Sequence, residues 1–131
     1  MKKRYIAFAI LMVILLAISC GPSAPPPQIT EEQINLAVQG IKEYPDVQDA
    51  AVYQEGKKLS LVVIVDYGTS EERAKELGDN FVRMVKTFGP EPAPSKEIGE
   101  GMFDYKIGVA YPNEEIVAIG AKVSFADHIT W

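Results

Sequence analysis

The chain of 131 residues contains one cysteine, Cys20, and one histidine, His128. A single cysteine cannot form a disulfide within the chain, and it cannot supply the several thiolates of a structural zinc site. A single histidine restricts both metal binding and general-base catalysis, because histidine is the side chain most often used for each. The sequence therefore predicts no metal site, no cofactor and no disulfide.

Basic side chains are also scarce, since 13 Lys and Arg stand against 18 Asp and Glu, which gives a formal charge of −5. Three of the basic residues, Lys2, Lys3 and Arg4, lie at the amino terminus, and the rest of the chain has a formal charge of −8. Nucleic-acid binding depends on clustered Lys and Arg that neutralise phosphates. The charge balance therefore predicts no nucleic-acid partner.

The apolar residues are unevenly distributed, because an unbroken run of 14 residues from Tyr5 to Ile18 directly follows the basic amino terminus. A basic segment followed by a short apolar run is typical of a secretory signal peptide. A helix of this length reaches only about 21 Å, less than the hydrocarbon core of about 30 Å. We predict that residues 1–19 are a signal peptide. The alternatives are an uncleaved anchor, or an ordinary signal peptide followed by an incidental cysteine.

The end of this run, Leu16-Ala17-Ile18-Ser19-Cys20-Gly21, resembles the lipobox of bacterial lipoproteins, in which small residues precede an invariant cysteine. The family most often has leucine at the position of Ala17. The resemblance implies that diacylglycerol is attached to the Cys20 thiol and that the leader is cut before Cys20. Gly21 is not the aspartate that marks inner-membrane retention in enterobacterial lipoproteins, so the resemblance favours the outer membrane in a host with two membranes.

A proline-rich segment separates Cys20 from the rest of the chain. Residues 21–28 contain three consecutive prolines, Pro25 to Pro27, and such a run favours an extended polyproline II conformation. Eight residues in this conformation span at most about 25 Å. We predict a signal peptide at residues 1–19, a lipidated Cys20 with its tether at residues 20–29, and a single α+β domain at residues 30–131.

Hydrophobic periodicity divides the domain into two helices and four strands. Thr30 and Gln33 form a capping-box signature for a helix over residues 31–44, and Thr69 and Glu72 repeat it for a helix that ends before Gly89-Pro90. Strands are predicted at about 47–54, 58–67, 102–111 and 115–125, paired as two hairpins. The order α-β-β-α-β-β favours a two-layer α+β sandwich, with two helices on one face of a four-stranded, mainly antiparallel sheet.

The predicted strand over residues 58–67 is apolar on both of its sides. Leucine and valine alternate on one side, while Val62 and Ile64 occupy the other. Such a pattern indicates a central strand that is covered on much of both faces or lies in an interface.

Residues Val47-Gln48-Asp49-Ala50-Ala51-Val52 and the order of the elements resemble the small α/β modules of the BON type and of some sporulation lipoproteins. The resemblance covers about residues 30–88. It implies an envelope-associated binding or assembly module without a catalytic centre.

Candidate catalytic residues are few. Asp127 and His128 could join a serine in a triad, but the chain has no Gly-x-Ser-x-Gly motif, and an ordinary surface histidine is the simpler interpretation. The pairs Glu31-Glu32 and Glu71-Glu72 begin predicted helices, where the helix dipole favours negative charge. We therefore predict a chain that is not an enzyme, with no catalytic, cofactor-binding or metal-binding residue, and Cys20 as the residue of lipid attachment.

Three features allow two interpretations each. The connection over residues 89–101, rich in proline and glycine, is a flexible connector or an extended segment presented to a partner. The aromatic residues Phe103, Tyr105 and Tyr111 have strand spacing and face the core or form a ligand-stacking platform. The terminal Trp131 is expected to pack onto the domain or to dock on a partner.

These observations predict a membrane-tethered extracytoplasmic lipoprotein that acts as a non-catalytic interaction or assembly module of the cell envelope. Its expected partners are the membrane, through acyl chains on Cys20, and an envelope protein. The alternative is a lipoprotein that binds a small ligand or solute, although about 100 residues leave little room for a closed, drug-sized cavity.

Overall fold

The computed structural model describes residues 25–131. The predicted signal peptide and the lipid-bearing Cys20 lie outside the described residues. The described elements are, in chain order, α2 (Glu31–Lys42), β1 (Val47–Glu55), β2 (Lys58–Val65), α3 (Glu71–Phe88), β3 (Asp104–Ala110) and β4 (Ile116–Lys122). The α-β-β-α-β-β order and the α+β class predicted from the sequence are confirmed, with strand ends that differ by a few residues.

Both helices begin at a side-chain cap, but only one cap is the predicted residue. The Thr30 hydroxyl accepts the amide of Gln33, and the Gln33 side chain accepts the amide of Thr30, so the predicted capping box of α2 is confirmed. The predicted cap of α3 at Thr69 is wrong, because Ser70 caps this helix by accepting the amide of Arg73. Thr69 belongs to the preceding turn, where its amide donates to the Asp66 carbonyl at 3.0 Å.

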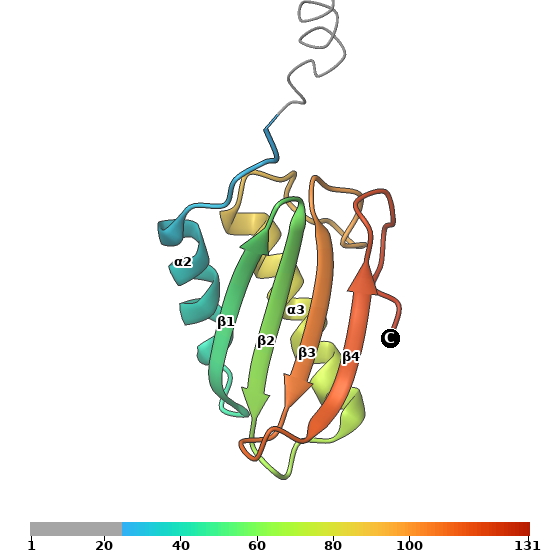
Figure 1. Ribbon diagram of the computed structural model, residues 1–131. Helices are drawn as coiled ribbons and strands as arrows, with labels where there is room; N and C mark the ends of the chain where they lie inside the picture. Colours follow the sequence, from blue (N-terminus) through green and yellow to red (C-terminus); the bar gives the residue numbers. More distant parts are fainter. Residues whose placement is uncertain (1–24) are drawn as a thin grey trace, which may run out of the picture.

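The sheet has the strand order β1-β2-β3-β4 and is mixed (Figure 1). The pairs β1–β2 and β3–β4 are antiparallel hairpins, as predicted, but β2 and β3 are parallel neighbours. The prediction of a mainly antiparallel sheet is therefore only partly right. Its centre is a parallel junction because α3 runs back along the sheet and returns the chain to the end at which β2 starts, as parallel neighbours require.

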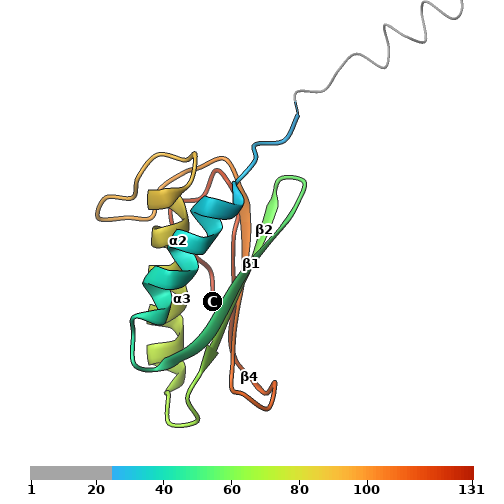
Figure 2. The same cartoon turned by 90° about the vertical axis from the view of Figure 1, so that its left-hand side faces the viewer.

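The two helices form one layer and the sheet forms the other, as Figure 2 shows. Helix α2 lies against β1, and α3 lies against β2, β3 and β4. Every second residue of the central strands points into the space between the layers and is fully buried: Leu59, Leu61, Val63 and Val65 from β2, and Tyr105, Ile107 and Val109 from β3. Phe103 and Tyr105 are buried in this core, so the core interpretation of these two aromatic residues is confirmed.

The connection after α3 has no regular structure, as predicted, but it is anchored through two buried charged residues. The Glu91 carboxylate accepts the backbone amides of Met102 and Phe103, and it accepts the hydroxyl of Tyr105. The Lys86 ammonium donates to the carbonyls of Gly99 and Glu100 at 3.0 and 2.9 Å. We call Lys86, Glu91, Tyr105 and Lys122 the buried polar cluster; Lys122 lies over the Tyr105 ring.

Burial shifts the pKa values of Lys86, Tyr105 and Lys122 in this cluster. Desolvation lowers the pKa of Lys86, and the nearby Glu91 carboxylate opposes this shift. Desolvation also lowers the pKa of Lys122, and the charge of Lys86 lowers it further. Burial raises the pKa of the Tyr105 phenol, and its hydrogen bond to Glu91 raises it again.

The buried phenol makes the stability of the fold sensitive to high pH. In the unfolded chain Tyr105 titrates near its ordinary pKa of about 10. A group whose pKa is higher in the folded state stabilises the fold below the unfolded pKa, and this contribution is lost as the pH rises above it. Between pH 9 and pH 11 we expect the wild-type chain to lose about 1 kcal/mol relative to Tyr105→Phe, measured by urea unfolding. Identical pH profiles for the two proteins would contradict the buried, protonated phenol.

The carboxy terminus packs onto the domain, which is one of the two outcomes predicted for Trp131. Thr130 forms a two-way backbone bridge with Ala121 at the free edge of β4. The Trp131 ring lies against Gly78 of α3 and Gly120 of β4, where a Cβ atom would come within 2.5 and 2.7 Å of ring carbons. Glycine at both positions therefore makes room for the indole between the helix and the sheet.

Candidate functional site

The sheet surface that faces away from the helices is not covered by any element of residues 25–131, as the side view shows (Figure 2). The alternating burial of β2 and β3 identifies the residues that point to this side, because their neighbours in sequence are the buried core positions. We call this surface the outer face. By strand alternation and register its members are Asp49, Ala51, Tyr53, Glu55, Lys58, Ser60, Val62, Ile64, Asp104, Lys106, Gly108, Ala110, Ile116, Ile119 and Ala121.

Strand register arranges these residues in rows that cross the sheet. One row runs from Ala51 through Val62 and Gly108 to Ile119. The next row towards the α2–β1 turn contains Ile64, Ala110 and Ile116, with Asp49 at its β1 end. Seven of the eight residues in these two rows are apolar or glycine.

The opposite end of the outer face is charged. The row nearest the β1–β2 turn contains Glu55, Lys58 and Asp104, in which the sign of the charge alternates. Between the charged row and the apolar rows lies a mixed row of Tyr53, Ser60, Lys106 and Ala121. The outer face therefore combines an apolar half with a polar half.

The large apolar side chains of the outer face are strongly exposed: Tyr53 is 64% exposed, Ile116 57% and Ile119 52%. Single exposed apolar residues are ordinary on protein surfaces, but a contiguous patch marks an interaction surface or an aggregation hazard. The exposure of these large apolar residues on neighbouring positions of one sheet surface makes the outer face the strongest candidate site among the described residues.

A shallow hollow of about 340 Å³ lies in the middle of the outer face. The residues that line it include Val62, Gly108, Ile116 and Ile119. Among residues 25–131, a Cβ atom at Gly108 would meet no other atom within 4 Å, so packing of the described residues does not require glycine there. Glycine inside a strand lowers stability and often marks a place where another group approaches closely.

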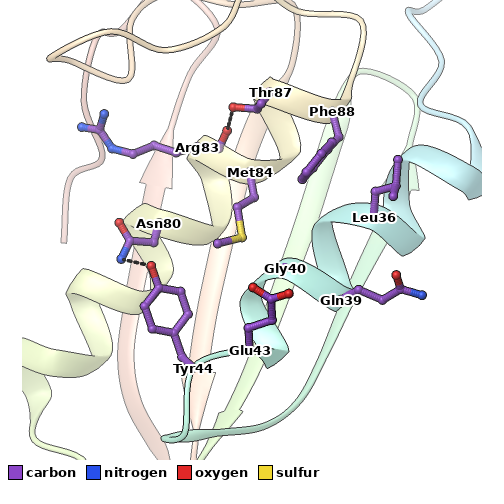
Figure 3. A pocket seen from close by; sticks show the side chains of 10 residues that line it. All are labelled: Leu36, Gln39, Gly40, Glu43, Tyr44, Asn80, Arg83, Met84, Thr87 and Phe88. Atoms are coloured by element: carbon purple, nitrogen blue, oxygen red, sulfur yellow. Dashed lines mark hydrogen bonds between the residues drawn. The ribbon is translucent and has the colours of Figure 1, made fainter.

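A second depression, of about 490 Å³, lies between α2 and α3 on the opposite layer (Figure 3). Leu36 and Phe88 are both partly exposed at its upper end, and Met84 lies beside Gly40 in its middle. Its other end is polar, because the Asn80 amide donates to the Tyr44 hydroxyl at 3.4 Å. This helix groove is open to solvent and is the second candidate site.

Asp127 and His128 lie together on the surface, with 2.6 Å between the His128 Nδ1 and the Asp127 Oδ1. Within residues 25–131 no serine forms a hydrogen bond with His128; the nearby Ser124 hydroxyl instead accepts the Lys57 ammonium at 3.0 Å. The structure therefore does not bring the triad considered from the sequence together.

The acidic pairs considered from the sequence lie at helix starts in the structure. Glu31, Glu32, Glu71 and Glu72 occupy the first turns of their helices, as predicted. In the described part of the chain, no three His, Cys, Asp or Glu side chains are grouped so that they could hold a metal ion. No helix within residues 25–131 has both the length and the apolar composition needed to cross a bilayer.

Sequence reasoning missed the buried polar cluster. Lys86 directly follows Val85 on the buried side of α3, and Lys122 follows Ala118 and Gly120 at inward positions of β4. The alternation of side chains along β4 predicts that Lys122 points towards the core between the sheet and the helices. Glu91 lies in a proline-rich loop without regular structure, so no periodicity in the sequence predicts that it is buried.

Comparison of the chain with protein-family models, with curated proteins and with solved structures finds no match.

Proposed function

We propose that this chain is a membrane-tethered extracytoplasmic lipoprotein that acts as a non-catalytic interaction or assembly module of the cell envelope. The observation that carries the proposal is the outer face, an exposed apolar sheet surface bounded by a charged row. The apolar leader, the small residues before Cys20 and the proline-rich segment after it support the membrane tether.

The start of the domain suits a tethered role. The chain approaches from the end of the molecule that carries the β1–β2 turn (Figure 1). The Gln54 side chain donates to the Pro27 carbonyl at 2.6 Å and accepts the Ile29 amide at 3.2 Å. These bonds fasten the start of the domain to β1, so that a lipid anchor at Cys20 would hold the charged end of the outer face nearest the membrane.

The lipid anchor is tested by Cys20→Ser in the full chain. We expect the variant to leave the membrane fraction, because a chain without acyl groups loses about 0.8 kcal/mol of membrane affinity for each methylene group removed. Ser23→Ala serves as the matched control and is expected to stay with the membrane. Retention of the Cys20→Ser protein in the membrane after its leader has been cut would show that lipidation is not the anchor.

The interaction role is tested by a photoreactive residue on the outer face. In the full chain expressed in bacterial cells, p-benzoylphenylalanine replaces Tyr53, which points outward from β1. We expect light to produce a covalent adduct with a protein. The same replacement of Phe88, an exposed aromatic residue on the helix layer, is the control and is expected to give no such adduct. Absence of any protein adduct at position 53 would argue against the proposed role.

Binding of a small ligand or solute is the second candidate function, and the helix groove favours it. Leu36, Met84 and Phe88 offer an apolar wall, while Tyr44 and Asn80 offer hydrogen-bonding groups at one end. A ligand that stays bound during gentle purification would appear as an added mass in the native mass spectrum.

A further inference from the structure

We propose that the partner at the outer face is a second copy of this chain, related to the first by a twofold axis that runs parallel to the strands between β2 and β3. The proposal rests on the proposed interaction role and names its partner.

The twofold axis determines which strands face each other. Rotation about it places β2 over the second copy's β3, and β1 over the second copy's β4. Each row across the sheet stays level with the same row of the second copy. The two sheets then pack face to face, about 10 Å apart and rotated by about 30° because each sheet is twisted.

Large and small residues alternate between the strands that this axis brings together. Val62 faces the second copy's Gly108, and Ile64 faces the second copy's Ala110. At the outer strands Ile119 faces the second copy's Ala51, and Tyr53 faces the second copy's Ala121. All of these positions follow from the register of the four strands.

The central hollow gives this pairing a specific fit. Gly108 lines this hollow, and a Cβ atom added to it would meet no atom of residues 25–131 within 4 Å. In the proposed dimer the Val62 side chain of each copy enters the hollow of the other. A glycine that lowers the stability of a central strand thereby accommodates a branched side chain from the facing sheet.

Lys58 and Asp104 of the charged row are complementary under the same rotation, while Glu55, on the edge strand β1, has no charged partner in this pairing. Lys58 faces the second copy's Asp104, and Asp104 faces the second copy's Lys58, so that two opposite-charge pairs form. The neighbouring Lys106 faces the second copy's Ser60. Asp49 faces the second copy's Ile116, and this pair lies on the edge strands, at the rim of the interface, where water can hydrate the carboxylate.

An axis running across the strands gives a poorer fit. It would stack β2 on β2 and β3 on β3, so that the branched residues Val62 and Ile64 would meet each other. Gly108 and Ala110 would also meet each other and leave a gap. This axis would in addition place the two tethers at opposite ends of the dimer, whereas the axis along the strands keeps both at the end that carries the β1–β2 turn.

The outer face is large enough for a weak dimer. Four strands at about 4.8 Å spacing and seven residues at about 3.3 Å rise cover about 450 Å² on each copy. The two copies would bury about 900 Å², less than the 1,200 Å² or so at which stable complexes begin. Attachment of both copies to one membrane raises their effective concentration, which compensates for a weak contact.

The test uses the Tyr53 photoreactive variant of the full chain, co-expressed with two different epitope tags. We expect an adduct of twice the chain mass that carries both tags, with the cross-link mapped to the second copy's β4 near Ala121. The Phe88 variant is expected to give no adduct of this mass. Added in the Tyr53 background, Val62→Asp is expected to reduce the adduct at least about tenfold because it buries an unpaired charge, whereas Leu36→Asp on the helix layer leaves it unchanged.

A charge exchange tests the orientation. Lys58→Asp and Asp104→Lys each place like charges opposite each other in a dimer of identical copies, and each is expected to reduce the adduct at least about fivefold. A mixture of the two variants restores opposite charges at both pairs and is expected to restore the adduct. Because Asp104 also accepts the Ser124 amide, circular dichroism checks the fold of each variant before mixing.

The outcomes separate this inference from the proposed function. If the only adduct at position 53 is with a different protein, the inference that the partner is a second copy of this chain is wrong, and the proposed interaction role remains. A double-mass adduct that Val62→Asp leaves unchanged would overturn the dimer through the outer face. Absence of any adduct at this position would count against both proposals.

Discussion

Glu91→Ala is expected to lower the free energy of unfolding by about 3–5 kcal/mol, as breaking a buried charge network typically does. The carboxylate is nearly fully buried and accepts the Met102 amide, the Phe103 amide and the Tyr105 hydroxyl. Alanine would leave these donors without a partner, and each buried unsatisfied group costs about 1–3 kcal/mol.

The two buried lysines increase this effect. Lys86 and Lys122 lie in the same cluster, and the charge of Glu91 favours the protonated form of both. Without Glu91 the two ammonium groups still repel each other, Lys86 loses the carboxylate that raises its pKa, and Lys122 keeps only the influence of Asp104 and Asp127, so the pKa values of both lysines are expected to fall further. The variant would gain protons on unfolding at pH values between the lowered pKa of the folded state and the ordinary lysine pKa of 10.5, so its stability is expected to decrease as the pH falls through that range.

Urea unfolding measures the loss of stability in Glu91→Ala, and Glu97→Ala is the matched control. Glu97 belongs to the same loop but is exposed, and its replacement is expected to change stability by less than about 0.5 kcal/mol. Glu91→Gln keeps an acceptor without the charge and is expected to fall between these two variants. Equal stability of Glu91→Ala and Glu97→Ala would mean that the cluster does not hold the loop.

Gly120→Val is expected to destabilise the fold by about 1–3 kcal/mol through overpacking. A Cβ atom at this position would lie 2.7 Å from Ile129 and 2.7 Å from the Trp131 ring. Valine has a higher strand propensity than glycine, which alone would stabilise the strand. The sign of the measured change in the free energy of unfolding therefore shows whether overpacking or strand propensity is larger.

Gly108→Val is the matched control, because it places the same side chain on the other surface of the same sheet. Its Cβ atom would meet nothing within 4 Å, and we expect unchanged or higher stability in dilute solution. In a double-mutant cycle, Trp131→Ala is expected to reduce the cost of Gly120→Val, because it removes one of the two clashing groups. An additive cycle would show that Trp131 does not lie against Gly120.

Local signals in the sequence predicted the element order well. Thr30 and Gln33 predicted the first helix because a capping box is a contact between neighbours in the chain. The same signature misplaced the second cap by one residue, since the turn before α3 recruits the Thr69 backbone and leaves Ser70 as the cap. Sequence spacing alone does not show which of two adjacent hydroxyl residues becomes the cap.

Features that depend on contacts between distant residues were harder to predict. The parallel pairing of β2 and β3 depends on where α3 returns the chain, and the role of Glu91 depends on amides 11 and 12 residues further on. The outer face was partly anticipated, because Val62 and Ile64 predicted either coverage or an interface. The structure shows that no described element covers them, which excludes coverage within residues 25–131.

The parallel junction also has a consequence for how the chain folds. The two hairpins join near neighbours in sequence, and such hairpins form within about 1–10 μs. Pairing of β2 with β3 joins residues 46 positions apart, and non-local pairing of this kind slows folding. We expect the two halves, each a helix followed by a hairpin, to gain structure early and the pairing of β2 with β3 to form last. Until β2 and β3 pair, the edges that they later share are open to pairing with strands of neighbouring chains. The risk of such mispairing between chains is greatest where many copies fold close together on one membrane surface.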